Sequence, residues 1–233
     1  MDSNNKYSEM QRGFYNTTTH LMAKENHRNH DANPDYWSIL LKPIRENSVK
    51  WKGKNALDFG CGTGRNVTNM WRMAEWERVA GVDISENNIK KAEEIILSEG
   101  VPKKDFFLNF NDGVSLNIFP DDTFDFVMST IVFQHIAVYE IRYNLMAEIF
   151  RTMRSGGVFS FQMGFGEGHG KATYYENAYN ATGTNSLYDT TVTSTEQLRK
   201  DLEKIGFINF EYEIRPSFSD GNPFWVFIKV IKQ

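Results

Sequence analysis

The sequence of 233 residues contains a single cysteine, Cys61, so it can form no internal disulfide and has too few thiols for a cysteine-based metal site. It also lacks any apolar run approaching the roughly 20 residues that span a bilayer. Its first residues, MDSNNKYSEMQRGFYN, lack the basic-then-apolar order of a secretory signal. We therefore expect a cytoplasmic protein in a reducing compartment, with no membrane partner.

Positive charge is not in excess, since the formal net charge is −4. A protein that follows a phosphate backbone usually carries a basic face, so we expect no nucleic-acid partner. The exception is the stretch 42–54, in which five basic side chains are opposed only by Glu46. A solvated helix end that leads into a buried strand explains this stretch more simply than a nucleic-acid patch does.

No linker rich in proline, glycine or serine divides the chain, so we expect a single domain over 1–233 with one α/β core. Short apolar runs alternate with longer stretches of helical character, which predicts a mostly parallel sheet covered by helices on both faces. The predicted strands are 56–59, 79–82, 106–110, 124–129 and 158–163, and the clearest helices are 85–98 and 139–153.

The two ends of the chain differ from this pattern. Segment 1–33 shows no clean helical periodicity, and a helix is expected from Pro34, to be bent or ended by Pro43. Near the C-terminus a helix precedes two strands, 207–214 and 224–231, whose short connection makes them antiparallel. The expected parts are an N-terminal helical cap (1–50), a cofactor-binding core (51–163), an insertion (164–193) and a C-terminal helix with a strand pair (194–233).

Residues 58–64, Asp-Phe-Gly-Cys-Gly-Thr-Gly, end the first predicted strand and open a helix, where glycine lets backbone amides approach a ligand. The spacing differs from the G-x-G-x-x-G of dinucleotide sites, and a carboxylate at Asp58 suits an ammonium better than a pyrophosphate. The second strand ends at Asp83, where an acidic side chain can accept both ribose hydroxyls of an adenosine. Residues 111–113 follow the third strand and are placed to reach the adenine edge. A lone glycine-rich turn can be free of ligand, but four features in register are a stronger signal.

These residues together resemble the class I S-adenosylmethionine-dependent methyltransferase family. The resemblance continues through PDDTFDFVMSTIVFQHI at 120–136 and RTMRSGGVFSF at 151–161, and it covers about half of the chain. It implies an α/β, Rossmann-like doubly wound fold with a seven-stranded sheet, mostly parallel, whose last strand is antiparallel. It also implies S-adenosylmethionine as the cofactor and S-adenosylhomocysteine as its product. The cofactor-binding residues that it implies are Asp58, Gly60, Cys61, Gly62, Asp83, Ile84, Asn111, Asp112, Gly113 and Ser129.

Cys61 lies inside the glycine-rich turn, so a nucleophilic or redox thiol is one interpretation of it. The resemblance favours the other interpretation, a small residue that packs beneath the turn.

The methyl acceptor should lie at the carboxyl ends of the strands, where ligands bind in open α/β sheets. His135 follows the fourth strand and could take a proton from an acceptor hydroxyl, or could simply pack near the cofactor at a helix start. The insertion 164–193 is long enough to be functional, and His169 and Asp189 in it are secondary candidates for proton transfer or substrate contact. Its tyrosines could form a polar and aromatic lid over a hydroxylated small molecule, or could pack on the sheet edge. They are Tyr174, Tyr175, Tyr179 and Tyr188.

Two further absences narrow the function. No Asn-Pro-Pro-Tyr or Asp-Pro-Pro-Phe follows the fourth strand, which speaks against amino-methyltransferases of nucleobases or glutamine. The spacing of His20, His27, His30 and Asp31 supplies no tetrahedral ligand set, so we expect no metal.

We therefore expect an enzyme that methylates an oxygen, with nitrogen as the second choice, of a small polar metabolite such as a sugar or sugar nucleotide. It should act as a monomer or homodimer. The alternatives are a methyltransferase of RNA or protein, and a non-catalytic S-adenosylmethionine-binding subunit that stabilises a partner.

Overall fold

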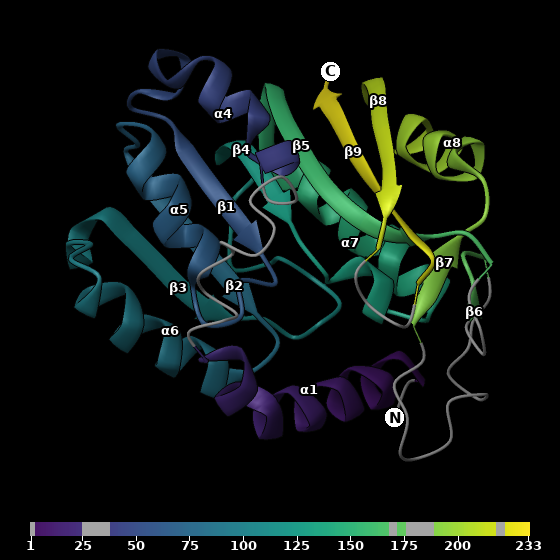
Figure 1. The fold of residues 1–233 in the computed structure, drawn as a ribbon, viewed down its shortest axis with the longest axis horizontal. Coiled ribbons are helices and arrows are strands. Elements are labelled where there is room, and N and C mark those ends of the chain that lie inside the picture. The colour runs from purple at the N-terminus through teal and green to yellow at the C-terminus, as the bar shows by residue number, and fades with distance from the viewer. Residues whose placement is uncertain (1–2, 25–37, 168–171, 176–188, 218–221) are drawn as a thin grey trace.

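The computed structural model describes residues 3–24, 38–167, 172–175, 189–217 and 222–233. Within them lies one sheet of nine strands in the order β3-β2-β1-β4-β5-β7-β6, with β9 paired to β5 and β8 paired to β9 (Figure 1). The strands are β1 (Asn55–Phe59), β2 (Arg78–Asp83), β3 (Phe106–Phe110), β4 (Phe124–Ser129), β5 (Met153–Phe165), β6 (Ala172–Thr173), β7 (Thr190–Val192), β8 (Phe207–Pro216) and β9 (Phe224–Lys232). The α-helices are α1 (Ser3–Met22), α4 (Lys42–Glu46), α5 (Arg65–Met73), α6 (Glu86–Ser98), α7 (Tyr139–Thr152) and α8 (Thr195–Ile205).

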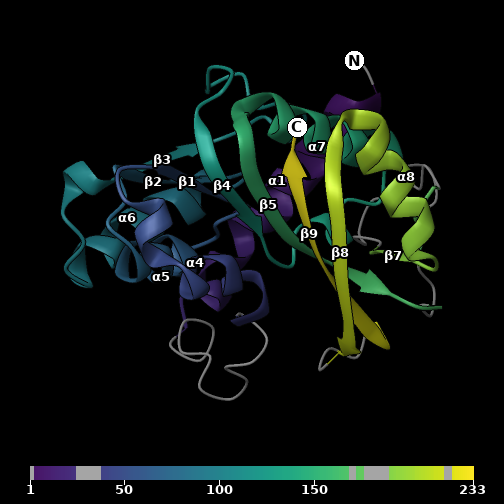
Figure 2. The same cartoon turned by 90° about the horizontal axis from the view of Figure 1, so that it is seen from above.

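Helices cover both faces of the sheet, as a doubly wound fold requires. Side chains of α4, α5 and α6 pack against one face, and side chains of α7 and α8 pack against the other (Figure 2). Alternation along β4 supplies both cores: Phe126 and Met128 point to the first, whereas Val127 points to the second. The predicted α/β architecture is therefore confirmed.

The predicted strands lie where the sequence indicated. Strands β1 to β5 pair in parallel, and β9 runs antiparallel between β5 and β8. The expectation of seven strands was short by two, because β6 and β7 come from the insertion 164–193. These strands have only two and three residues, mostly threonine, so no apolar run marks them in the sequence.

Within the expected N-terminal cap, residues 3–22 form the helix α1, although the sequence there shows no clean helical periodicity. The residues that α1 buries are partly polar, such as Ser8 and Gln11, whereas Phe14 and Leu21 are 47% and 41% exposed. Hydrophobic periodicity therefore gave no warning of this helix. Figure 1 shows α1 running across the ends of the central parallel strands.

The start of the helix expected at Pro34 lies outside the described residues. Residues 38–40 are helical, the chain turns at Leu41, and Pro43 occupies the first turn of α4, where its missing N–H costs no hydrogen bond. Within the described ranges, no helix is both long enough and apolar enough to cross a bilayer.

Candidate functional site: a cavity closed by the N-terminal helix

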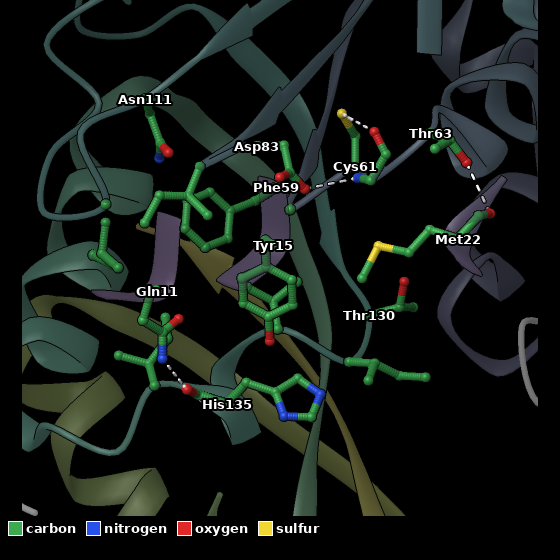
Figure 3. A pocket seen from close by; sticks show the side chains of 18 of the residues that line it. Gln11, Tyr15, Met22, Phe59, Cys61, Thr63, Asp83, Asn111, Thr130 and His135 are labelled. Carbon is green, nitrogen blue, oxygen red and sulfur yellow. Dashed lines mark hydrogen bonds between the residues drawn. The ribbon is translucent and has the colours of Figure 1, made fainter. Parts of the chain in front are cut away.

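The glycine-rich turn between β1 and α5 forms one wall of a cavity of about 270 Å³ (Figure 3). The backbone amides of Gly60 and Cys61 both donate to the carbonyl oxygen of Val82, which fixes the turn against β2. Gly60 has φ +75°, and a Cβ there would lie 2.1 Å from Cγ2 of Val132, so this glycine is required for packing. A Cβ on Gly62 would meet only Sδ of Met22, at 3.7 Å. Gly62 is therefore the position of the turn that faces open space.

Two buried carboxylates lie at this wall. Asp83 lines the cavity, and its Oδ2 accepts from the Gly62 amide at 2.9 Å while Oδ1 accepts from the Ser85 amide at 2.9 Å. Asp58 is 1% exposed and lies behind the lining, and neither of its oxygens has a hydrogen-bond partner among the described residues. Burial raises the pKa of Asp58 to about 7, against the opposing effect of the Arg65 guanidinium. Burial also raises the pKa of Asp83, although its hydrogen bonds oppose the shift.

The helix α1 forms the opposite wall through residues that share one helical face. These cavity-lining residues are Tyr7, Ser8, Gln11, Tyr15 and Met22. Both ends of the helix are bound to the rest of the site. Near its start, the hydroxyl of Tyr7 accepts from the backbone amide of Ala137 at 2.7 Å, and in the middle of the helix the side-chain Nε2 of Gln11 donates to the carbonyl oxygen of His135 at 2.6 Å. At its end, the hydroxyl of Thr63 donates to the carbonyl oxygen of Met22 at 3.1 Å.

The histidine after β4 lies in the same cavity and is paired with an acid. Nδ1 of His135 lies 2.7 Å from Oδ1 of Asp189, and the two side chains are 26% and 20% exposed. A carboxylate can only accept, so this contact places the imidazole proton on Nδ1 and leaves Nε2 free to accept a proton. The sequence suggested both residues separately, and the structure brings them together across 54 positions.

Tyr15 is a site residue that the sequence analysis missed. Its ring centre is 6.5 Å from that of His135, and Figure 3 shows it inside the cavity with its hydroxyl directed toward the histidine. Burial raises the pKa of Tyr15, and the charges of Asp189 and Asp83 raise it further. The phenol is therefore neutral at physiological pH. The spacing of Tyr7, Gln11 and Tyr15 by four residues was the signal that could have located this face.

Some of the other residues implied for the cofactor line the cavity, and the rest lie outside it. Ile84, Asn111 and Gly113 line the cavity, as does Cys61, whose thiol pKa is raised by burial, which opposes a thiolate role.

Besides Asp58, two of the implied residues lie outside the lining. The Asp112 side chain is exposed and accepts from the amides of Val114 and Ser115, at 2.9 and 2.6 Å, in its own turn. The hydroxyl of Ser129 is buried and donates to the carbonyl oxygen of Phe59 at 2.9 Å. Both side chains therefore hold backbone, Asp112 in its own turn and Ser129 at the end of β1, rather than face the cavity.

The tyrosines of the insertion are placed away from the cavity where they are described. Tyr174 is 1% exposed and packs against Tyr139, while the exposed Tyr175 donates its hydroxyl to the carbonyl oxygen of Gln197. His169, Tyr179 and Tyr188 lie outside the described residues, as do His27, His30 and Asp31. His20 is exposed on α1, and the described residues contain no group of three or more side chains able to hold a metal ion.

Comparison with known proteins shows which proteins this chain is similar to. Residues 57–161 match the family model described as a methyltransferase domain. The chain is similar to the "Probable methyltransferase ltbC" of Aspergillus luteorubrus, with 28% identity over 105 residues, which are 44% of this chain and 37% of that protein.

Solved structures share the fold over most of the chain. The phosphoethanolamine N-methyltransferase 2 of Haemonchus contortus, in complex with phosphomonomethylethanolamine and S-adenosylhomocysteine, matches with a TM-score of 0.69 and 20% identity. That match covers 97% of this chain and 60% of the other. The cyclase SpnF matches with a TM-score of 0.62 and 17% identity, covering 83% and 79% of the two chains. The matched part of this chain thus spans 37% of ltbC and 60% of the Haemonchus enzyme.

The family match covers the turn, Asp83 and the strands that carry them, and the structural matches extend the same architecture to both ends of the chain. Residues 57–161 therefore match a methyltransferase domain, and the chain shares its fold with solved methyltransferase structures.

Proposed function

We propose that the protein binds S-adenosylmethionine in the α1-covered cavity and transfers its methyl group to an oxygen of a small polar metabolite, such as a sugar or sugar nucleotide. One observation carries the proposal. The glycine-rich turn, Asp83 and His135, whose Nδ1 contacts Asp189, all lie around the single cavity that α1 covers. A cationic donor and a proton acceptor can therefore meet there.

The wall at Asp58 and Asp83 suits this donor. The unpartnered carboxylate of Asp58 favours a positively charged ligand nearby, and Asp83 lines the cavity at the end of β2, where ribose hydroxyls bind in such folds. Gly62 leaves room for close approach. When bound, S-adenosylmethionine supplies an electrophilic methyl group on a good leaving group.

His135 is the residue proposed to accept the proton of an acceptor hydroxyl. Asp189 orients the ring through Nδ1, so Nε2 is available as the base. The neutral hydroxyl of Tyr15 lies on the same side of the cavity and can donate a hydrogen bond to the acceptor.

Two observations favour a small acceptor: the site is a cavity, and lysines of the basic stretch 42–54 form ion pairs within the chain. Lys52 pairs with Glu75 at 2.6 Å, and Lys54 lies 3.6 Å from Asp125, so these cations are already engaged within the chain. This weighs against a methyltransferase of RNA. The insertion 164–193 is proposed as the segment that contacts the acceptor, and it supplies Asp189, which orients His135.

An amine acceptor is the second candidate, favoured by the similarity to a phosphoethanolamine N-methyltransferase. The cyclase SpnF shares this fold, so the fold alone does not establish methyl transfer. A non-catalytic subunit would bind S-adenosylmethionine without transferring its methyl group.

The test is to incubate the protein with methyl-labelled S-adenosylmethionine and separate pools of sugars or sugar nucleotides, small amines, RNA and protein. Label in the sugar pool supports the proposal, label in amines supports the second candidate, and label in RNA or protein contradicts both. Binding without label in any pool would indicate a non-catalytic subunit.

A second test concerns the base. His135→Ala should keep its affinity for S-adenosylhomocysteine and slow transfer to a hydroxyl by about 10²–10⁴-fold. His20→Ala is the matched control, because that histidine is exposed on α1 and does not line the cavity. Unchanged turnover in His135→Ala would remove the histidine as the base.

A further inference from the structure

Arg142, in the first turn of α7, is a buried cation outside the cavity. Its side chain is fully buried, and it makes no ion pair with a carboxylate in the described part of the chain. Burial lowers the pKa of Arg142 to about 10, which still leaves the guanidinium charged at neutral pH. The charges of Glu140 and Asp201 act on it, but neither carboxylate forms an ion pair with it, so its direct contacts need an explanation.

The guanidinium binds two backbone carbonyl groups that belong to different segments. One terminal nitrogen donates to the carbonyl oxygen of Ile136, and the other donates to that of Tyr174. The ring centres of Tyr139 and Tyr174 lie 5.9 and 5.1 Å from the guanidinium carbon, so the cation also rests on aromatic faces. Arginine suits this arrangement because its planar fork can serve two acceptors at once.

Each carbonyl is next to one half of the His135–Asp189 pair. Ile136 directly follows His135 in the chain. Tyr174 directly follows β6, whose Thr173 pairs with Thr191 of β7, and Asp189 immediately precedes β7. Arg142 therefore binds the segment that carries the base and the segment that leads to its acid.

The sheet explains why such a link is needed. At its carboxyl end, β5 pairs with β9 along one side through Gly164 and Phe165. The same two residues pair with β7, which must therefore lie on the other side, where β4 has already ended. Only two residue pairs hold β7 to β5, and two hold β6 to β7. Such short pairings leave the position of Asp189 weakly determined by the sheet alone.

We propose that Arg142 is a positioning residue that keeps His135 and Asp189 in contact by binding the backbone of both segments at the same time. This inference rests on the proposed function, in which His135 is the base. A purely structural side chain at this place would need only to fill space, which an apolar residue of similar length does without burying a charge.

The test uses an observable that a packing role would not change. The Nδ1 proton of His135, held in a 2.7 Å contact with a carboxylate, should give a proton resonance well downfield of the backbone amides in ¹⁵N-labelled protein at low temperature. Asp189→Asn should remove it and so assign it. Arg142→Met should fold, as judged by circular dichroism and thermal unfolding, and lose the resonance.

The matched control is Tyr139→Phe. It keeps the ring beside the guanidinium but removes the hydroxyl that donates to Asp201 at 3.1 Å, so it perturbs the same buried cluster without touching either carbonyl. The resonance should persist in this variant. If it persists in folded Arg142→Met as well, or is absent from the wild-type protein, the proposal is overturned.

A further variant covers a failure of Arg142→Met to fold. Arg142→Lys keeps the charge but has no fork to serve both carbonyl groups, so the resonance should weaken or disappear, and full intensity would overturn the proposal. Once an acceptor is known, Arg142→Met should lower kcat on the order of 10²-fold while the affinity for S-adenosylhomocysteine stays unchanged.

Failure of this inference can be told from failure of the proposed function. The resonance is measured without cofactor or acceptor, whereas methyl transfer is measured by label. A wild-type protein that shows the resonance but transfers no label contradicts the function alone. Label transfer together with an unaffected resonance in Arg142→Met contradicts the inference alone.

Discussion

The burial of Asp58 makes a quantitative prediction about cofactor binding and pH. With a pKa of about 7, the ionised fraction of Asp58 falls from about nine-tenths at pH 8 to about one-tenth at pH 6. A cationic ligand favours the ionised form, so the affinity for S-adenosylmethionine should fall about tenfold over this range, or about 1.4 kcal/mol. Binding at pH 6 should also be accompanied by the release of a proton.

Isothermal titration calorimetry at pH 6 and pH 8, in buffers of different ionisation enthalpy, measures both quantities. Asp58→Asn is the control, because it keeps the shape of the side chain and removes its titration while the ligand's own amino group still titrates. The difference between the two proteins therefore belongs to Asp58. Equal pH dependence in both would refute the reasoning.

The buried carboxyl group of Asp58 should also make the free energy of unfolding depend on pH. Because burial raises the pKa of Asp58 above that of the unfolded chain, the native state retains the proton over a range in which the unfolded state has lost it. The free energy of unfolding should therefore fall as the pH rises from about 4 to 7. Urea titrations should show a shallower fall for Asp58→Asn, and an identical fall would place the titration elsewhere.

Three further substitutions test the walls of the cavity. Gly60→Ala should destabilise the fold by roughly 2–4 kcal/mol in urea unfolding, because the new Cβ would overlap Val132 at a positive φ. Gly62→Ala should cost only about 1–2 kcal/mol, because its φ is also positive but no atom blocks the new Cβ. Tyr7→Phe should cost about 1–3 kcal/mol, since the lost hydroxyl leaves a buried backbone amide unpaired; an unchanged unfolding midpoint would contradict that accounting. Asp83→Ala should weaken S-adenosylhomocysteine binding by about 1.5–3 kcal/mol in calorimetry, and full affinity would exclude Asp83 from the ribose contact.

Much of the fold was predictable because a buried parallel strand appears in the sequence as a short apolar run. Strands such as β4 are apolar on both faces, so residues 124–129 were assigned with the bounds that the structure shows. The short strands β6 and β7 show no such apolar run, because they only extend a sheet that β5 and β9 already form. Their existence depends on β5 continuing past the end of β4.

The candidate site was predictable in part for a related reason. The turn at 58–64 and Asp83 are adjacent through strand pairing, with Asp58 aligned to Gly81 in the register of β1 and β2, so a motif and a spacing located them. Tyr15 and Arg142 have no such marker. Tyr15 lies on a helix with a mostly polar buried face, and Arg142 would be read as a surface residue from its sequence context.

The sequence by itself therefore determined the α/β class and the position of the glycine-rich turn, because alternating apolar runs and glycines with positive φ are local requirements of the chain. Only the tertiary structure decided that α1 closes the cavity and that His135 meets Asp189. These contacts join segments more than 50 positions apart. They depend on where the ends of strands and helices lie in the folded chain, and no local pattern of residues predicts those positions.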